Sequence, residues 1–406
     1  MTPELKRTLL FLHIPKTGGN TVTGVLSTRF AEQDCRPLYL GPVDDLSDLD
    51  RFRYVTGHVT ASFTGRFQTP PYVVTILRDP IERSLSSYSY LQRLSPEYVR
   101  SLSLLERGED SHDRLLRCVE LTRALPIDEI IRTEPLLANE FFGNRQARVV
   151  GGTDPRGGGE SLDRALEGLK RLDFVGLSDR LDESIRWLTL RLGWRDLNPL
   201  PRTNVNAERV RREQLSAQAL ATLQEFTAID SELYRHAVAD YERLSAGWSS
   251  SRDPLDEAVD IPDASAVEDL SYDQAIPGAG WVARERVADQ PSFAWIGDPR
   301  TASVELVSNG AADSVRVEIA HALDQSILEG LRISVDGSLV QHELSAAGGV
   351  LVATASLRRR RWRRRYRISR VTLEVDRTAR PSDLDPASAD DRELSIAVQR
   401  IALQPT

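Results

Sequence analysis

The sequence has little cysteine: Cys35 and Cys118 are the only two in 406 residues. With only two thiols, we expect neither a disulfide framework nor a metal site with thiolate ligands. No run of about 18 apolar residues is present, so no transmembrane helix is expected. The apolar run at residues 8–14 is too short for the core of a signal peptide and leads directly into a motif. We therefore expect a cytoplasmic protein.

The chain also lacks a basic surplus. It has 52 Lys and Arg against 60 Asp and Glu, which gives a formal net charge of −8. An acidic chain argues against a general nucleic-acid-binding protein, although a local basic pocket is still compatible with it. The length exceeds that of one average domain, so two or more hydrophobic cores are expected. These numbers leave the oligomeric state open.

Strands and helices alternate in the first half of the chain, which is typical of an α/β fold. The clearest buried strand is residues 71–78, which are rich in Val and Ile. Further strands are expected at residues 8–14, 53–59 and 173–180. Helices are expected at residues 21–30, 79–94, 113–145, 161–172, 181–194 and 216–244.

The composition changes after about residue 245, where Ser, Asp, Pro and Gly become frequent. Short alternating runs follow, and their spacing predicts a β-sandwich. We therefore expect a first domain at residues 1–247, a linker at 248–277 and a β-sandwich accessory domain at 278–406. The expected strands are residues 301–308, 313–323, 330–337, 348–357, 367–376 and 393–403.

The first motif, HIPKTGGNT, occupies residues 13–21 between a strand and a helix. Paired glycines let backbone N–H groups approach an anion, and the helix N-terminus adds positive potential. Lys16 adds a full charge, and the side chains of Thr17, Asn20 and Thr21 can donate hydrogen bonds. The lysine precedes the glycines, so this is not a Walker A loop. An ordinary turn between strand and helix is the alternative interpretation.

The second motif, LRDPIERSLSSY, occupies residues 77–88. The preceding strand delivers Arg78 to its carboxyl end, where ligands of open α/β sheets bind. Asp79 can cap the following helix, and Pro80 is tolerated in its first turn. Ser86 lies about two turns further on, so that Arg78 and Ser86 can form a small phosphate clamp. Helix capping and surface salt bridges are the alternative.

In this order, the two motifs resemble those of the sulfotransferases that use 3′-phosphoadenosine-5′-phosphosulfate (PAPS). The resemblance is closest to the branch with the heparan sulfate and uronosyl 2-O-sulfotransferases. It covers residues 8 to 245 and implies a P-loop-like parallel sheet flanked by helices. Weaker similarities continue at residues 144–152 and 173–194.

The resemblance also implies roles for individual residues. The first motif would hold the 5′-phosphosulfate, while Arg78 and Ser86 would hold the 3′-phosphate. Lys16 would also stabilise the leaving oxygen during transfer, and no metal is expected. The residues implied for the 5′-phosphosulfate are Lys16, Thr17, Gly18, Gly19, Asn20 and Thr21.

His58, in the sequence YVTGHVTASF, resembles the histidine that serves as general base in the uronosyl branch. An imidazole can accept a hydroxyl proton near neutral pH. A buried histidine that ends a strand is the alternative. Glu82 is the second choice for the base, and His13 is interpreted as structural.

The acceptor is expected to be a hydroxyl group, and the branch resemblance favours a carbohydrate. A tyrosine side chain or a small molecule is an alternative acceptor. Residues 358–367 (RRRRWRRRYR) suggest a surface for an anionic glycan, with Trp362 and Tyr366 stacking on sugars, or else a solvated charged loop. Two other functions stay open: a P-loop kinase, and a glycan-binding protein with a degenerate sulfotransferase domain.

Overall fold

The structure is a computed structural model, and it describes most of the chain. Within the described part, no helix is both long enough and apolar enough to cross a membrane. The described residues are 7–39, 46, 48–101, 109–153, 159–194, 200, 210–248, 266–287, 290–308, 312–347, 350–357, 367–385, 388 and 390–404.

Contacts between Cα atoms divide the chain into two compact units. The first unit comprises Met1–Gly19, Arg36–Leu192 and Asn206–Ile261, and the second comprises Asn20–Cys35, Gly193–Val205 and Pro262–Thr406. The domain boundaries expected at residues 247 and 278 stay a prediction.

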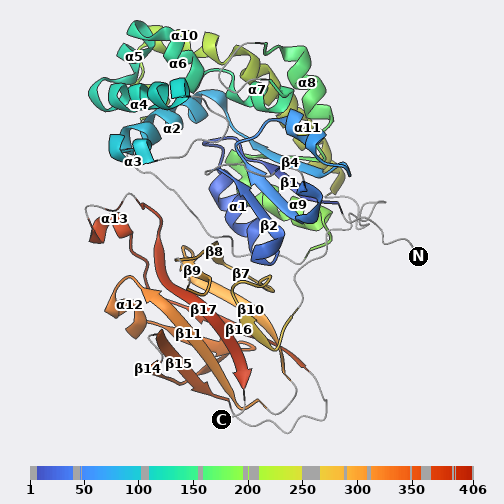
Figure 1. The fold of residues 1–406 in the computed structure, drawn as a ribbon, viewed down its shortest axis with the longest axis vertical. Helices are drawn as coiled ribbons and strands as arrows, with labels where there is room; N and C mark the ends of the chain where they lie inside the picture. Colours follow the sequence, from blue (N-terminus) through green and yellow to red (C-terminus); the bar gives the residue numbers. More distant parts are fainter. Residues whose placement is uncertain are drawn as a thin grey trace. The chain divides into compact units, whose positions relative to one another are not determined.

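The core of the first unit is a five-stranded parallel sheet with the strand order β2-β3-β1-β4-β5 (Figure 1). Every residue of β1 and β4 is buried, as expected for central strands covered on both faces. Leu12, the last residue of β1, pairs with Gly57 of β3 and Thr75 of β4, so these strands end at the same edge. The strands are β1 (Leu9–Leu12), β2 (Cys35–Leu38), β3 (Tyr54–Gly57), β4 (Tyr72–Leu77) and β5 (Phe174–Leu177).

The predicted helices of the first unit are confirmed, with breaks that the sequence pattern did not resolve. The expected helix at 113–145 is interrupted at Pro126 and Pro135, because the residue before a proline disfavours the helical conformation. α9 and α11 contact β5, while α4 and α6 contact α2. The helices are α2 (Pro80–Arg93), α3 (Pro96–Ser101), α4 (Glu109–Ala124), α5 (Ile127–Thr133), α6 (Pro135–Phe142), α7 (Arg145–Gly151), α8 (Leu162–Lys170), α9 (Leu181–Arg191), α10 (Ala217–Phe226) and α11 (Ala228–Trp248).

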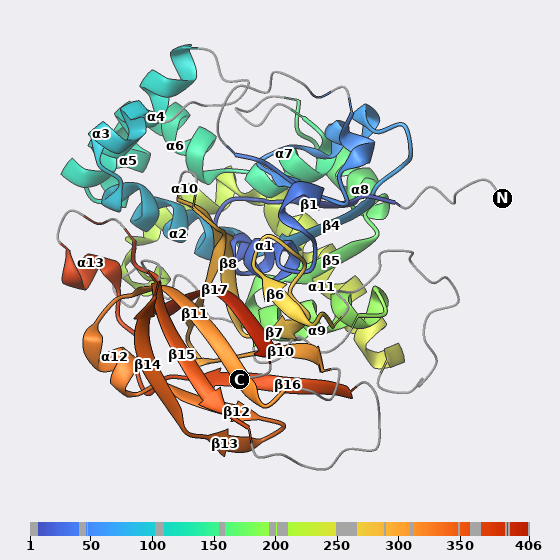
Figure 2. The ribbon, with the colours of Figure 1, turned by 60° about the horizontal axis from the view of Figure 1, so that its bottom comes forward.

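The second unit contains two antiparallel sheets, whose strand orders are β13-β12-β16-β10-β7 and β14-β15-β11-β17-β9-β8, with β6 beside β17 (Figure 2). All six expected strands are found there, as β10, β11, β12, β15, β16 and β17. The bounds are β6 (Asp269–Ser271), β7 (Gly278–Ala279), β8 (Trp281–Glu285), β9 (Phe293–Gly297), β10 (Thr301–Ser308), β11 (Ser314–Ala322), β12 (Arg332–Val335), β13 (Ser338–Val340), β14 (His342–Ala347), β15 (Val350–Ser356), β16 (Arg367–Glu374) and β17 (Leu394–Gln404), with the short helices α12 (Gln325–Glu329) and α13 (Pro381–Leu384).

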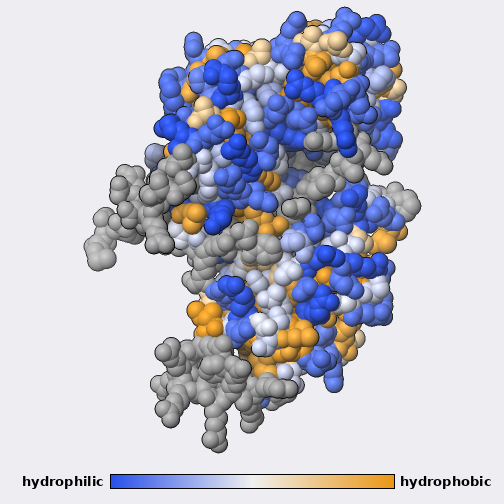
Figure 3. Space-filling view, turned by 180° about the vertical axis from the view of Figure 1, so that it is seen from behind, coloured by the Kyte–Doolittle hydropathy of each residue, from blue (hydrophilic) through white to orange (hydrophobic). Residues whose placement is uncertain are grey.

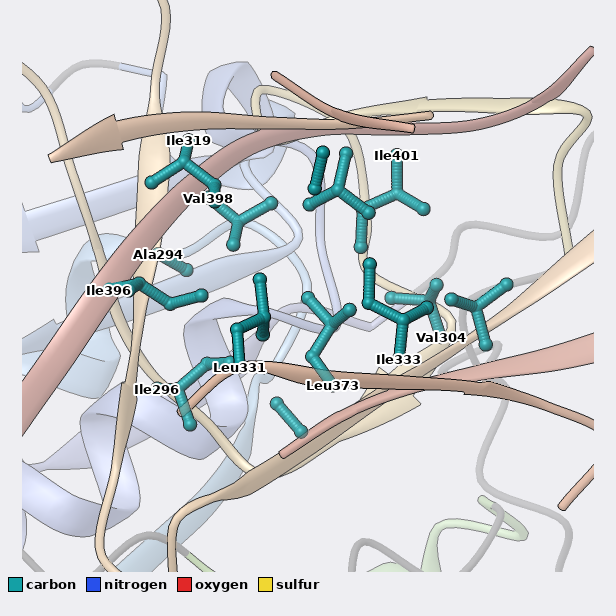
Figure 4. Packing of buried hydrophobic residues seen from close by; sticks show 14 of the residues in the cluster. Ala294, Ile296, Val304, Ile319, Leu331, Ile333, Leu373, Ile396, Val398 and Ile401 are labelled. Carbon is teal, nitrogen blue, oxygen red and sulfur yellow. The ribbon is translucent and has the colours of Figure 1, made fainter. Parts of the chain in front are cut away.

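A single hydrophobic cluster joins the two antiparallel sheets (Figure 4). Ile396 and Val398 of β17 point toward Leu373 of β16 and Ile333 of β12, and all four side chains are at most 1% exposed. Buried residues alternate with more exposed ones along β16, whereas the first five residues of β17 are all buried, and each of the two strands contributes one face to this core. The face of the molecule in Figure 3 is largely hydrophilic, with hydrophobic patches interrupted by polar side chains.

Helix α1 (Gly19–Ser27), which begins within the first motif, groups from Asn20 onward with the second unit. The buried guanidinium of Arg29 donates to the carbonyls of Ile276 and Gly278, each at 2.9 Å. The N–H of Ile276 donates in return to the carbonyl of Thr28 at 2.7 Å. Arg29 is thus held by main-chain acceptors that lie about 250 residues away in the sequence.

Candidate active site

The loop between β1 and α1 contains two residues with positive φ, Lys16 at 70° and Gly18 at 88°. A lysine in this region is uncommon and costs on the order of 1–2 kcal/mol, so neighbouring groups must hold it. Arg78 Nη1 donates to the Lys16 carbonyl at 3.0 Å, and the buried Thr17 hydroxyl donates to the Ile14 carbonyl at 2.9 Å. The hydroxyl of Thr17 therefore shapes the loop itself.

The paired glycines of this loop meet two different requirements. Gly18 provides the left-handed backbone conformation, which glycine adopts without steric cost. Gly19 provides space, because a Cβ atom there would lie 2.1 Å from Cδ2 and 2.2 Å from Nε2 of His13. The His13 ring consequently lies directly against the first residue of α1.

His13 is the centre of a polar cluster at the end of β1. Its N–H donates to the Gly57 carbonyl at 3.0 Å, and its Nδ1 lies 2.6 Å from the Tyr39 hydroxyl, which lies 2.9 Å from Thr56 Oγ1. Burial, and then the charge of Lys16, lower the pKa of His13 to about 4. The imidazole is therefore neutral at physiological pH. The structural role of His13 stays a prediction.

The structure brings His58, the predicted general base, to this cluster. His58 follows β3 directly and is exposed. Its ring centroid lies 5.0 Å from that of His13 and 5.0 Å from that of Tyr39, with both pairs edge-on. The imidazole is thus exposed, whereas the alternative interpretation expected a buried histidine at the end of this strand.

Positive charge gathers at the same loop. The Lys16 ammonium lies 4.2 Å from the centre of the Tyr90 ring. Burial, and then the charges of Arg93 and Arg78, lower the pKa of Lys16 to about 8. Like charges held this closely repel one another, and a bound anion would relieve that repulsion. The loop therefore has the electrostatics of an anion site.

Helix α2 presents one face to this loop. Ser86, Tyr90 and Arg93 are spaced by four and three residues, so they lie on one side of a helix. Because Lys16 packs on Tyr90, this side faces the loop, and Ser86 is partly buried on it. Asp79 caps the helix by accepting from the Glu82 N–H at 2.9 Å, and Pro80 is its first residue, as predicted.

The other predicted contacts lie at the start of α1, where Asn20 is exposed and Thr21 is buried. Glu82, the second choice for the base, lies 4.0 Å from the Arg78 guanidinium. Sequence reasoning missed Tyr39, Tyr90 and Arg93. The four-residue spacing from Ser86 to Tyr90 was the available signal for the last two, while nothing local indicates Tyr39.

Two further predictions concern a metal and the arginine-rich stretch. No group of three or more His, Cys, Asp or Glu side chains that could hold a metal ion is found among the residues that the structure describes. Trp362, Tyr366 and the other residues of 358–366 lie outside the described residues.

Comparison with known proteins adds no assignment. No family model matches the chain, and no curated protein matches it significantly. The function must therefore be argued from the residues of the site.

Proposed function

We propose that this chain is a sulfotransferase that moves a sulfuryl group from PAPS to a hydroxyl acceptor. The convergence of Lys16, Arg78 and Arg93 on the loop after β1 is the observation that carries the proposal. Both the 5′-phosphosulfate and the 3′-phosphate of this donor are anionic, which suits a site where several cationic side chains gather. The position of the loop between the first strand and helix of a parallel sheet supports a P-loop-like domain.

In the proposed reaction the acceptor oxygen attacks the sulfur in line with the bridging oxygen of the donor. The new bond joins the acceptor oxygen to sulfur, and the bond from sulfur to the bridging oxygen breaks. The acceptor proton passes to His58, and the electron pair stays on the 5′-phosphate of the departing bisphosphate. Lys16 stabilises that developing charge, so positioning and electrostatics supply most of the catalysis.

The two sheets of the second unit are proposed to form a β-sandwich accessory domain. Their shared hydrophobic core supports this arrangement. A hydroxyl of a carbohydrate is the proposed acceptor, on the basis of the sequence resemblance. A tyrosine side chain or a small molecule is the competing acceptor class.

A thermal-shift comparison separates sulfotransferase from kinase and from binding protein. Adenosine 3′,5′-bisphosphate is expected to raise the melting temperature, because it binds the folded state alone. ATP with Mg²⁺ is expected to shift it much less, since it has no 3′-phosphate for Arg78. A larger shift with ATP would favour a kinase, and a shift with sulfated glycans but neither nucleotide would favour a degenerate domain.

A further inference from the structure

Gln146, which was not predicted to belong to the site, forms two hydrogen bonds with the backbone of Arg78. Gln146 lies on α7 and is 1% exposed. Its Oε1 accepts from the Arg78 N–H at 2.8 Å, and its Nε2 donates to the Arg78 carbonyl at 2.8 Å. One primary amide thus pairs with both polar main-chain groups of a single residue, at the turn from β4 into α2.

Gln146 is itself held on a fixed support. The buried carboxylate of Asp230 on α11 accepts from the N–H groups of Gln146 at 3.2 Å and Ala147 at 2.7 Å. These N–H groups belong to the first turn of α7, where they have no partner within the helix. The N–H of Asp230 donates to Asn144 Oδ1 at 3.0 Å, which closes the network. These hydrogen bonds therefore hold the N-terminal end of α7, which carries Gln146, against α11.

Arg78 connects Gln146 to the anion site at the loop after β1. The backbone of Arg78 is fixed by Gln146, while its guanidinium donates to the Lys16 carbonyl in the loop. A change in the backbone of Arg78 would move the guanidinium, and a hydrogen bond weakens steeply when its geometry is lost.

We propose that Gln146 is a positioning residue for recognition of the 3′-phosphate. It acts through Arg78 and does not contact the donor. This proposal rests on the proposed function, since it assumes that Arg78 binds the 3′-phosphate of the nucleotide.

The quantity that separates this role from a purely structural one is a ratio of affinities. AMP shares the adenosine and 5′-phosphate of adenosine 3′,5′-bisphosphate but lacks the 3′-phosphate. General loosening of the fold would weaken both ligands, whereas a displaced Arg78 lowers the preference for the bisphosphate. The experiment is calorimetric titration of the full chain with each nucleotide.

Gln146→Met removes both hydrogen bonds, and Gln146→Glu keeps the size but cannot donate to the Arg78 carbonyl when ionised. Each is expected to lower the ratio of the two affinities by about tenfold. Gln92→Met is the matched control, because it removes a glutamine bond to the Tyr88 hydroxyl elsewhere in the same unit. We expect it to leave the ratio unchanged.

A double-mutant cycle tests whether the effect passes through Arg78. In an Arg78→Ala background, Gln146→Met is expected to change the ratio no further. An unchanged ratio in both Gln146 variants, or an equal effect in the Arg78→Ala background, would overturn the proposal. Loss of the folded state in both variants would overturn it too, by assigning Gln146 to stability. A wild type with no preference for the bisphosphate would instead refute the proposed function itself.

Discussion

Replacing His58 with alanine is expected to slow sulfuryl transfer by about 10² to 10⁴, the usual value of a positioned base. The affinity for adenosine 3′,5′-bisphosphate should stay nearly unchanged, because the proposed donor contacts come from the loop after β1, from Arg78 and from α2. His58 is exposed and its ring meets those of His13 and Tyr39 edge-on, so its removal is expected to leave no buried cavity. The measurement is a steady-state rate with saturating PAPS, together with calorimetry.

The dependence of the rate on pH gives a second test of His58 as the general base. The wild-type rate should rise with pH as the general base loses its proton. The His58→Ala variant should lose that rise, while His236→Ala, a control on α11 of the same unit, should keep it. A variant with a lower melting temperature, weaker binding of every ligand and an unchanged profile would assign His58 to structure. Glu82 would then be the next base to test.

Replacing Lys16 with alanine is expected to lower the rate of transfer by about 10² to 10³, as for loss of one preorganised group that stabilises developing charge. Folding should change little. Alanine has the same backbone preferences as lysine at a φ of 70°, so the strain in the loop is unaltered. The lost contact with Tyr90 is a cation–π interaction, worth about 0.5–1 kcal/mol at a partly exposed site.

Lys16 also predicts a pH dependence of donor binding. Its pKa is lowered to about 8, so the ammonium is present below that pH and is lost as the pH rises through it. The affinity for the bisphosphate should therefore fall between about pH 7 and pH 9, and Lys16→Arg should flatten this fall because arginine stays charged. Lys170→Ala, at an exposed site on α8, is the control. A Lys16→Ala variant with wild-type rate and melting temperature would exclude this residue from the mechanism.

Much of the fold could be predicted because the relevant signals are local. The apolar runs at residues 8–14 and 71–78 predicted β1 and β4, and the alternating runs after residue 300 predicted six antiparallel strands. β2 was not predicted, since its sequence CRPL is short and contains a proline. β14 was missed because most of its residues are exposed, so its sequence shows no apolar alternation.

The same contrast, between residues with a local sequence signal and residues without one, applies to the candidate site. The two motifs and His58 were predicted from sequence as parts of the site, and the structure brings His58 and His13 together at the ends of adjacent strands. Tyr39 and Gln146 were missed because their contacts, with His13 and Arg78, span 26 and 68 residues. No local pattern of residue types encodes a contact that only the tertiary fold creates.

The most direct test of the account is calorimetric titration of the wild-type chain with adenosine 3′,5′-bisphosphate and with AMP. Only the first has the 3′-phosphate that Arg78 and Ser86 are proposed to hold. A charge-assisted contact of this kind is worth on the order of 2 kcal/mol or more, which corresponds to about 30-fold in affinity. A preference for the bisphosphate of at least that size is expected. Equal affinities for the two nucleotides would contradict it.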